Sequence, residues 1–389
     1  MHFATIVSFE KSAKFLMQHH KVYVSASTSR RQTEAIGACA EAVQDEQAKS
    51  VLQQSSTLDG EDISSGKQVI SNDGSFISLR GGVYAEVKTA VIGEVEENKR
   101  HLKHRPDQEV KMTHLTYFSR MVNSETFTEL ATSEVARRGF FRTKQVCAVS
   151  DGAEWIQHFI DAHRTDAVRI LDFYHASEYL SDIEELIRNA GTALPENWLE
   201  EQCHVLKHQG PKKVLKEVNR LLKAHPERDD LVKLVNYLQK REKMMQYPLF
   251  QQQGWPIGSG SVESANTCVV QSRLKGSGMH WETRNVNPML ALRTGLCNDR
   301  WEDTRNQAFR QRLKTRQSSR LAHQKKRYEG FKQEVLRLLF FFSLHKPKRT
   351  DIPATQTALS SASSCVPDAK KVCRPAQSHP WRRYPCAKK

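Results

Sequence analysis

The chain has 389 residues, of which 38% are hydrophobic, and it carries a formal net charge of +15 at pH 7. This length allows two or three domains with a sizeable core, and the charge favours a polyanionic partner such as nucleic acid. A basic protein without such a partner is the alternative. No signal peptide is visible in Met1 to His20, and the apolar run Val335 to Leu344 is too short to span a bilayer. We therefore expect a cytoplasmic protein without membrane contact.

Two helices are predicted between Ser8 and Val43, where Phe9, Ala13 and Leu16 recur at helical spacing. A short turn separates them, and Arg30 and Arg31 lie near the start of the second helix. This pattern fits a helix-turn-helix in which both arginines contact DNA. Two ordinary packed helices have the same pattern.

Strand-like sequence follows from Lys67 to Phe76, and its Asp73-Gly74 pair predicts the end of the strand or a hairpin turn. Gly81 to Asn98 is rich in β-branched residues and predicts one or two further strands. Val110 to Arg138 predicts a helix, with Leu115 and Phe118 among its apolar positions.

Strands and helices then alternate. Two short apolar runs, Gln145 to Ser150 and Ala167 to Leu171, predict strands. Helices are predicted after each, over Gly152 to His163 and Tyr174 to Ala190. A long helical interval broken at Pro226, a glycine-rich loop and a helix over Ser261 to Lys275 complete this part.

The C-terminal part is basic. From Arg300 to Arg349 there are fifteen Lys and Arg against four Asp and Glu, which accounts for +11 of the net charge. Such an excess favours a helix or arm lying along phosphates, although a solvated helix face would also carry it. Residues 350–389 are rich in Ser, Pro and Ala and are expected to be mobile.

The eight cysteines are scattered without a CxxC pair, which is typical of a reducing compartment. Four donors near the C-terminus offer a zinc site, but their spacing matches no common one. They are Cys365, Cys373, His379 and Cys386.

This order of elements predicts an RNase H-like α/β fold: a mixed sheet with three antiparallel strands first, an all-helical insertion, a small helical region in front and a basic tail behind. The predicted domain limits are 1–58, 59–181, 182–253, 254–300, 301–349 and 350–389.

Such a sheet brings strand tips together, so that Asp73, Asp151 and Glu263 become candidate ligands for two Mg²⁺ ions, with Mn²⁺ able to substitute. Asp151 and Asp172 are also suited to capping the helices that follow them. "GSGS" at Gly258 to Ser261 lacks the context of a serine nucleophile, and no P-loop is present, so we expect no nucleotide cofactor.

Several stretches resemble bacterial insertion-sequence transposases of the Kra type, within the Mutator-like DDE superfamily. The most specific block runs from "IGSGSVESAN" (Ile257 to Asn266) to "RLKGSGMHWETRNVNPMLALR" (Arg273 to Arg293). "DGAEWI" (Asp151 to Ile156), "ILDFYHASEYL" (Ile170 to Leu180), "EVKTAVIGEV" (Glu86 to Val95) and the terminal "HPWRR" also match. Together these stretches span most of the chain from about residue 8.

The resemblance implies that Asp73, Asp151 and Glu263 form the DDE triad. It assigns "DFYH" to the [C/D]-x-x-H signature of the group, so that Asp172 and His175 would position the metal ligands or the DNA; a satisfied core histidine is the alternative for His175. Beyond Glu263, the resemblance also offers four candidate DNA contacts. Trp281 would either stack on a base or pack in the core. These four are Arg273, Lys275, His280 and Trp281.

The sequence departs from the family pattern in three places. It begins at what resembles the later helix pair, without the cysteine-rich region that usually precedes it. Val83-Tyr84 stands where the family often has a tryptophan, and Arg305 replaces a common aromatic. The short start puts recognition of the element ends in doubt.

The resemblance implies a transposase that cuts and joins DNA as a homo-oligomer on paired element ends. Truncated or repurposed remnants that bind DNA with little catalysis are the main alternative, and an RNase H-like nuclease that cuts without joining is another.

Overall fold

The computed structural model describes residues 1–53, 66–96, 110 and 112–344, and the side chains as far as residue 341. The chain divides into two compact units, residues 1–323 and 324–389. The first unit holds a mixed α/β fold built around one five-stranded sheet. This confirms the predicted fold class at the level of a mixed α/β protein.

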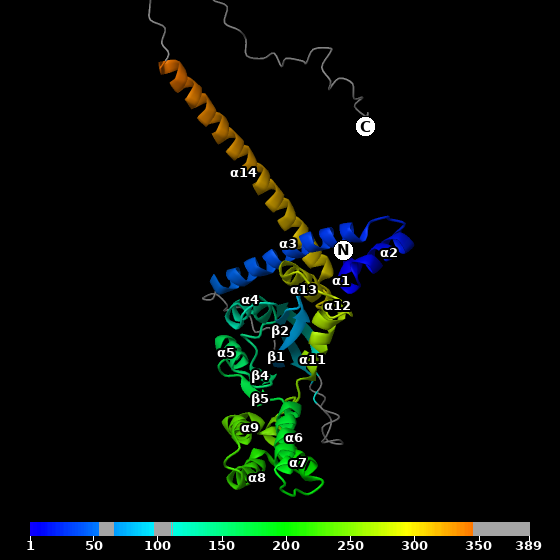
Figure 1. Ribbon diagram of the computed structural model, residues 1–389, viewed down its shortest axis with the longest axis vertical. Helices are drawn as coiled ribbons and strands as arrows, with labels where there is room; N and C mark the ends of the chain where they lie inside the picture. The colour runs from blue at the N-terminus through cyan, green and yellow to red at the C-terminus, as the bar shows by residue number, and fades with distance from the viewer. Residues whose placement is uncertain (54–65, 97–109, 111, 345–389) are drawn as a thin grey trace, which may run out of the picture. The chain divides into compact units, whose positions relative to one another are not determined.

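The sheet has the strand order β3-β2-β1-β4-β5. β1 (Lys67–Ser78), β2 (Tyr84–Val95) and β3 (Met112–Arg120) form an antiparallel meander, and β4 (Gln145–Ser150) and β5 (Val168–Leu171) run parallel to β1. The predicted order of three antiparallel strands followed by parallel ones agrees with the observed sheet (Figure 1). The third strand, however, lies outside the residues 67–98 in which the first three strands were predicted.

The first strand is longer than predicted. Asp73 and Gly74 lie within β1, opposite Thr89 and Lys88 of β2, so they form neither a strand end nor a turn. The hairpin turns instead at Gly81 and Gly82, whose φ angles of +86° and +78° favour glycine. An Asp-Gly pair marks a turn only where the chain reverses, and here the ladder continues on both sides of it.

The predicted helix from Val110 to Arg138 is wrong in its first half. Residues 112–120 form β3, and α4 (Ser124–Arg137) starts only after Asn123, whose side chain accepts a hydrogen bond from the Thr126 amide. Leu115 and Phe118 are three residues apart, which imitates a helical stripe. The segment forms a strand instead, because it pairs with β2 and contains β-branched and aromatic residues, which favour strands.

The alternating part agrees closely with expectation. α5 (Glu154–His163) and α6 (Phe173–Asn189) follow β4 and β5. One core packs the sheet against α4 and α5, with Ile70, Phe127 and Phe159 fully buried. A second core joins β4 and β5 to α6 and to the helices that follow α6.

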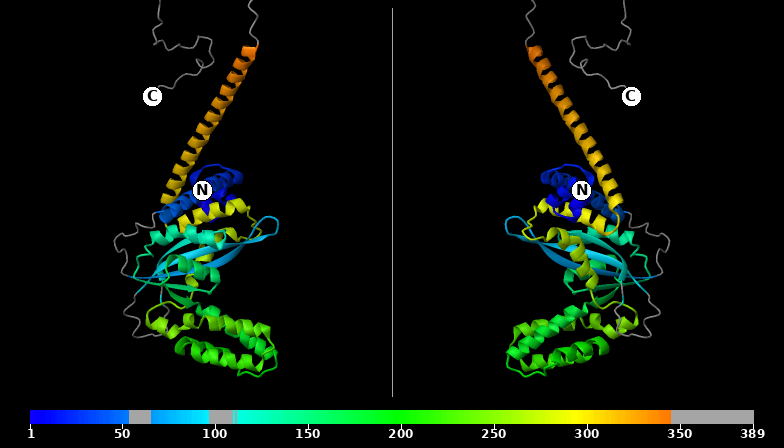
Figure 2. Two further views of the ribbon diagram at one scale, coloured as in Figure 1. Left: turned by 90° about the vertical axis from the view of Figure 1, so that its left-hand side faces the viewer. Right: turned by 90° about the vertical axis from the view of Figure 1, so that its right-hand side faces the viewer.

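The helical insertion comprises α7 (Trp198–Gln209), α8 (Pro211–Ala224), α9 (Asp229–Lys240), a 3₁₀ turn (Glu242–Met245) and α10 (Tyr247–Gln252). α8 and α9 form the hairpin predicted around Pro226. Figure 2 shows the insertion helices on the β5 side of the sheet, away from the turn that joins β1 and β2.

The chain then returns to the sheet. α11 (Gly260–Ala265), a π-helical stretch (Asn266–Gln271) and α12 (Ser272–Leu274) form the predicted helix, and α13 (Thr283–Cys297) follows. α11 packs against β1 and β2, and α13 packs against β3. The glutamate-bearing helix is therefore placed across the middle of the sheet.

Three helices precede the sheet: α1 (His2–Ile6), α2 (Phe9–His20) and α3 (Ala26–Gln53). α3 lies along α13 and α4 and buries Ile36, Ala40 and Ala48. α14 (Trp301–Leu344) is the last described element. Among the described residues, no helix combines the length and apolar character needed to cross a membrane.

Candidate active site at the ends of the central strands

Asp73 and Asp151 come level with each other through the parallel pairing of β1 and β4. The register pairs Ile70 with Ala148, and each aspartate lies three residues further along its strand direction. Parallel strands keep their register, so the two carboxylates meet at the same level of the sheet. Residues 78 positions apart are thus neighbours.

The Asp73 carboxylate is held by two hydrogen bonds. Its Oδ1 accepts from the Gly74 amide at 2.7 Å, and its Oδ2 accepts from Asn266 Nδ2 at 2.7 Å. Burial raises the pKa of Asp73 above its ordinary value, the negative charges of Asp151 and Glu263 raise it further, and the two hydrogen bonds oppose the shift. Asp151 and Glu263 therefore both lie close enough to Asp73 for their charges to act on it.

Asp151 begins the loop between β4 and α5. Its Oδ1 accepts a hydrogen bond from the Ala153 amide at 2.9 Å. The next residue, Gly152, has a φ of +77°, so the chain turns sharply directly after the acid. Because Ala153 occupies the capping position of α5 and makes no side-chain cap, Asp151 supports this turn without being the helix cap.

Glu263 lies in the first turn of α11 and is exposed. Asn266, one helical turn further along, is buried and holds Asp73. Residues three apart share a helix face, so the bond from Asn266 fixes the face of α11 that carries Glu263 toward Asp73. The structure thus places Asp151, at the end of β4, and Glu263, on α11, near Asp73 of β1.

The donor set consists of carboxylates, which suits magnesium better than zinc. Placing three like charges together with one partly buried is unfavourable, and a bound cation would offset that cost. Within the described parts of the chain, however, no three His, Cys, Asp or Glu side chains converge into a group that could hold a metal ion. The acids are neighbours without forming a closed ligand cage.

Asp172 caps α6. Its Oδ1 accepts from the amides of Tyr174 and His175, at 2.7 and 3.1 Å, and its Oδ2 accepts from the Ser259 amide at 2.5 Å. The last bond ties the start of α6 to the loop that leads into α11. Asp172 therefore helps to position the helix that carries Glu263, because Ser259 directly precedes that helix.

His175 faces aromatic rings. Its ring packs edge-on against Tyr179 and Tyr237, with centroids 5.2 and 6.0 Å apart, and Nδ1 lies 3.2 Å from Glu178 Oε2. The side chain is half-buried. It touches the residues that surround Asp151 rather than the acid itself.

Two predicted DNA contacts are interior residues. Arg273 is only 2% exposed, donates to the Ala4 carbonyl at 2.8 Å and lies between the rings of Phe9 and Trp281. Trp281 is 5% exposed, and its indole N–H donates to the Leu274 carbonyl. Contrary to prediction, the Arg273 side chain is not presented to a phosphate, and Trp281 takes the core-packing alternative. The two residues fasten α12 to the N-terminal helices.

The remaining predicted contacts are exposed. Lys275 and His280 lie beyond the glutamate helix, where His280 Nδ1 is 2.7 Å from the Ser78 hydroxyl. Arg30 and Arg31 lie on the exposed side of α3, and Arg30 is 3.9 Å from Glu34. Their use in DNA binding stays a prediction, as does the helix-turn-helix.

The described cysteines are all free. Cys268 and Cys297 lie closest, with their sulfurs 3.3 Å apart. The predicted zinc donors near the C-terminus lie outside the described residues, so that prediction stays open.

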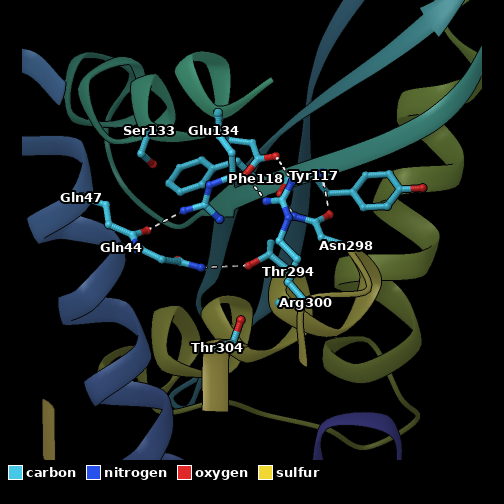
Figure 3. Close-up of a pocket in the computed structure, with 12 residues that line it drawn as sticks. Gln44, Gln47, Tyr117, Phe118, Ser133, Glu134, Thr294, Asn298, Arg300 and Thr304 are labelled. Carbon is cyan, nitrogen blue, oxygen red and sulfur yellow. Dashed lines mark hydrogen bonds and ion pairs between the residues drawn. The ribbon is translucent and has the colours of Figure 1, made fainter. Parts of the chain in front are cut away.

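A polar cluster away from the acids joins α3, α4, β3 and the α13–α14 connection (Figure 3). Arg300 forms a bidentate ion pair with the buried Glu134, at 2.6 and 3.0 Å. Gln44 donates to Thr294 at 3.3 Å, and Arg137 donates to Gln47 at 2.9 Å. These groups satisfy one another, so the cluster braces the N-terminal helices against the sheet.

Sequence reasoning missed Asn266, Tyr237 and Arg241. Asn266 holds Asp73, Tyr237 donates its hydroxyl proton to the Asp151 carbonyl, and Arg241 donates to the Gly152 carbonyl. The spacing Glu-x-x-Asn on a helix was the one signal that pointed to Asn266. Tyr237 and Arg241 gave no signal, because their partners lie 86 and 89 residues away.

Two comparisons with known proteins find no match. No family model matches the chain. A search of curated proteins also finds no match.

Proposed function

We propose that the chain is a DDE transposase of an insertion sequence, with an RNase H-like catalytic domain. The observation that carries the proposal is the placement of Asp73 and Asp151 at the same level of adjacent parallel strands, with the Glu263 helix tied to Asp73 through Asn266. The strand order with three antiparallel strands followed by two parallel ones supports the fold assignment. The resemblance of Ile257 to Arg293 to Kra-type transposases supports the activity.

The proposed chemistry is two in-line displacements at one site. Water first attacks the phosphodiester at the element end, and the freed 3′-hydroxyl then attacks a phosphodiester of the target DNA. Asp73, Asp151 and Glu263 are the residues that would hold Mg²⁺, and the bound metal would supply activation of the attacking oxygen and stabilisation of the leaving one. Asn266 holds the Asp73 carboxylate, and Asp172 secures the loop before Glu263.

A joining assay tests the proposal. Purified protein is incubated with Mg²⁺ or Mn²⁺, labelled DNA from the flanks of its gene and a target plasmid. We expect joined product from the wild type and a loss of at least about 10³-fold in Asp151→Ala and in Glu263→Gln, because removing a metal ligand removes most transition-state stabilisation.

The control variant is Asp182→Asn, which removes a carboxylate of α6 that has no place in the proposed triad and should retain activity. Cutting without joining, lost in Asp151→Ala, would indicate a nuclease. Metal-independent DNA binding without any product would refute the proposal and favour a DNA-binding remnant.

A further inference from the structure

The helical insertion reaches the candidate active site at its α9 end. The Tyr237 hydroxyl donates a hydrogen bond to the main-chain carbonyl of Asp151. Arg241, directly after α9, donates to the carbonyl of Gly152 from Nη2 at 2.6 Å and from Nε at 3.2 Å. The two residues therefore hold consecutive peptide carbonyls, at the acid and immediately after it.

Both side chains are themselves fixed. The Tyr237 ring stacks on Tyr179 with centroids 3.9 Å apart and planes within 8°, and the Arg241 guanidinium lies 3.7 Å from the centre of the Tyr237 ring. Arg241 Nη1 also donates to the Tyr237 carbonyl at 3.2 Å. His175 closes the cluster edge-on. Groups locked by packing and several hydrogen bonds can hold a neighbour in one position.

Gly152 makes this approach possible. A Cβ at this position would lie 2.5 Å from Arg241 Nε, and the φ of +77° is one that other residues rarely adopt. The glycine after Asp151 thus serves both the turn and the space for the guanidinium. Because the bonds from the insertion end on main-chain oxygens, they orient Asp151 while leaving its carboxylate to other partners.

We propose that Tyr237 and Arg241 are positioning residues, which aim the Asp151 carboxylate at a divalent cation. The inference rests on the proposed function, in which Asp151 is a metal ligand. It gives the helical insertion a direct part in the active site. Loss of groups that orient a metal ligand typically lowers metal affinity about 10–100-fold.

Two tyrosines offer a matched comparison. Tyr237→Phe removes a hydroxyl that donates to the carbonyl of Asp151, directly after β4. Tyr247→Phe removes a hydroxyl that donates at 3.0 Å to the carbonyl of Leu171, the last residue of β5. Both variants lose one hydroxyl of the insertion and one bond to a strand end, so a general loss of stability affects both. Arg241→Lys keeps the charge and loses the paired bonds to Gly152.

The first measurement is amide hydrogen exchange of the full chain without metal. We expect the peptide that contains Gly152 and Ala153 to exchange about tenfold faster in Tyr237→Phe than in the wild type, because the Ala153 amide is bonded to Asp151. Tyr247→Phe should leave this peptide unchanged. An unchanged peptide in Tyr237→Phe overturns the inference.

The second measurement is Mn²⁺ binding, followed by the electron paramagnetic resonance signal of the free ion. Tyr237→Phe and Arg241→Lys should raise the half-saturating concentration about tenfold, while Tyr247→Phe should stay within about twofold. Wild-type affinity in both Tyr237→Phe and Arg241→Lys would overturn the positioning role. If the wild type shows no Mn²⁺ binding that depends on Asp151, the proposed metal site is refuted. Faster exchange in Tyr237→Phe would in that case still establish that Tyr237 holds the Asp151 main chain in place.

Discussion

Single carboxylates in this protein experience opposite environments. Asp73 is partly buried beside two other acids, so its charged form is less favourable in the folded chain than in the unfolded chain. Asp230 is exposed and bound to Arg228 and to the Leu231 amide, which lower the pKa of Asp230 to about 2. The first pattern is typical of a functional site and the second of a surface ion pair.

The raised pKa of Asp73 makes the effect of its substitution on stability depend on pH. When the pKa is higher in the folded state, ionisation opposes folding, so stability falls as the pH rises from the ordinary value of 3.8 through the folded-state pKa. Asp73→Asn should therefore gain stability relative to the wild type as the pH rises to 7.5 without divalent ions, while abolishing the proposed activity. Thermal unfolding as a function of pH measures the gain, which should shrink as the pH falls toward 3.8.

Asp230→Asn is the control of opposite sign. A depressed folded-state pKa contributes stability above the unfolded-state pKa and loses it as the pH falls through about 2, so this substitution should lower the melting temperature at pH 7.5. A difference in melting temperature between Asp73→Asn and the wild type that does not change between pH 3.8 and 7.5 would show that ionisation of Asp73 does not oppose folding.

Among the elements, α3 and α13 pack closely against each other. A Cβ on Gly37 of α3 would lie 2.5 Å from the carbonyl oxygen of Pro288 in α13. Pro288 lies inside α13, so its neighbouring backbone has little freedom to move. The glycine therefore sets the distance between the two helices.

Gly37→Ala should destabilise the first unit by about 1–3 kcal/mol, because the added methyl group overpacks a tight interface. Calorimetry of the full chain measures the effect. Gly330→Ala is the matched control: it adds the same methyl to a helix with open space around it and should leave the main transition unchanged. Unaltered unfolding of Gly37→Ala would mean that α3 is not packed on α13 in solution.

Elements with local signals were predicted well, and those defined by distant partners were not. β4, α5, β5 and α6 follow from short apolar runs that alternate with amphipathic segments. β3 was missed because Leu115 and Phe118 fit a helical template, and only pairing with β2 reveals the strand. Asp151 and Glu263 were selected because an acid directly after a strand and an acid in the first turn of a helix are visible in sequence. Asp73 was selected as a strand end, although it lies within β1. Arg273 was misplaced because a basic residue near the end of a predicted helix gives no sign of burial.

Across the whole molecule, charge is the dominant feature. The net charge is +15, and the exposed surface of α14 contributes Lys325, Lys326 and Arg327 beside apolar residues such as Tyr328. A protein that neutralises phosphates releases counterions, so its affinity for DNA falls with salt by a slope that reflects the number of phosphates neutralised. The slope can therefore distinguish a phosphate-binding helix from a helix that merely carries charge.

Replacing Lys325, Lys326 and Arg327 by glutamine should reduce the slope of log affinity against log salt by about 0.9 for each phosphate that the variant no longer neutralises. The control removes the same charge from α8 by replacing Lys212, Lys216 and Lys223, which are exposed on the insertion. Fluorescence anisotropy with duplex DNA, from about 50 to 200 mM salt, measures both slopes. If α14 lies along the backbone, its variant loses slope and the α8 variant keeps most of it. Equal reductions would show that net charge alone drives binding, and an unchanged slope in the α14 variant would exclude that helix from the DNA interface.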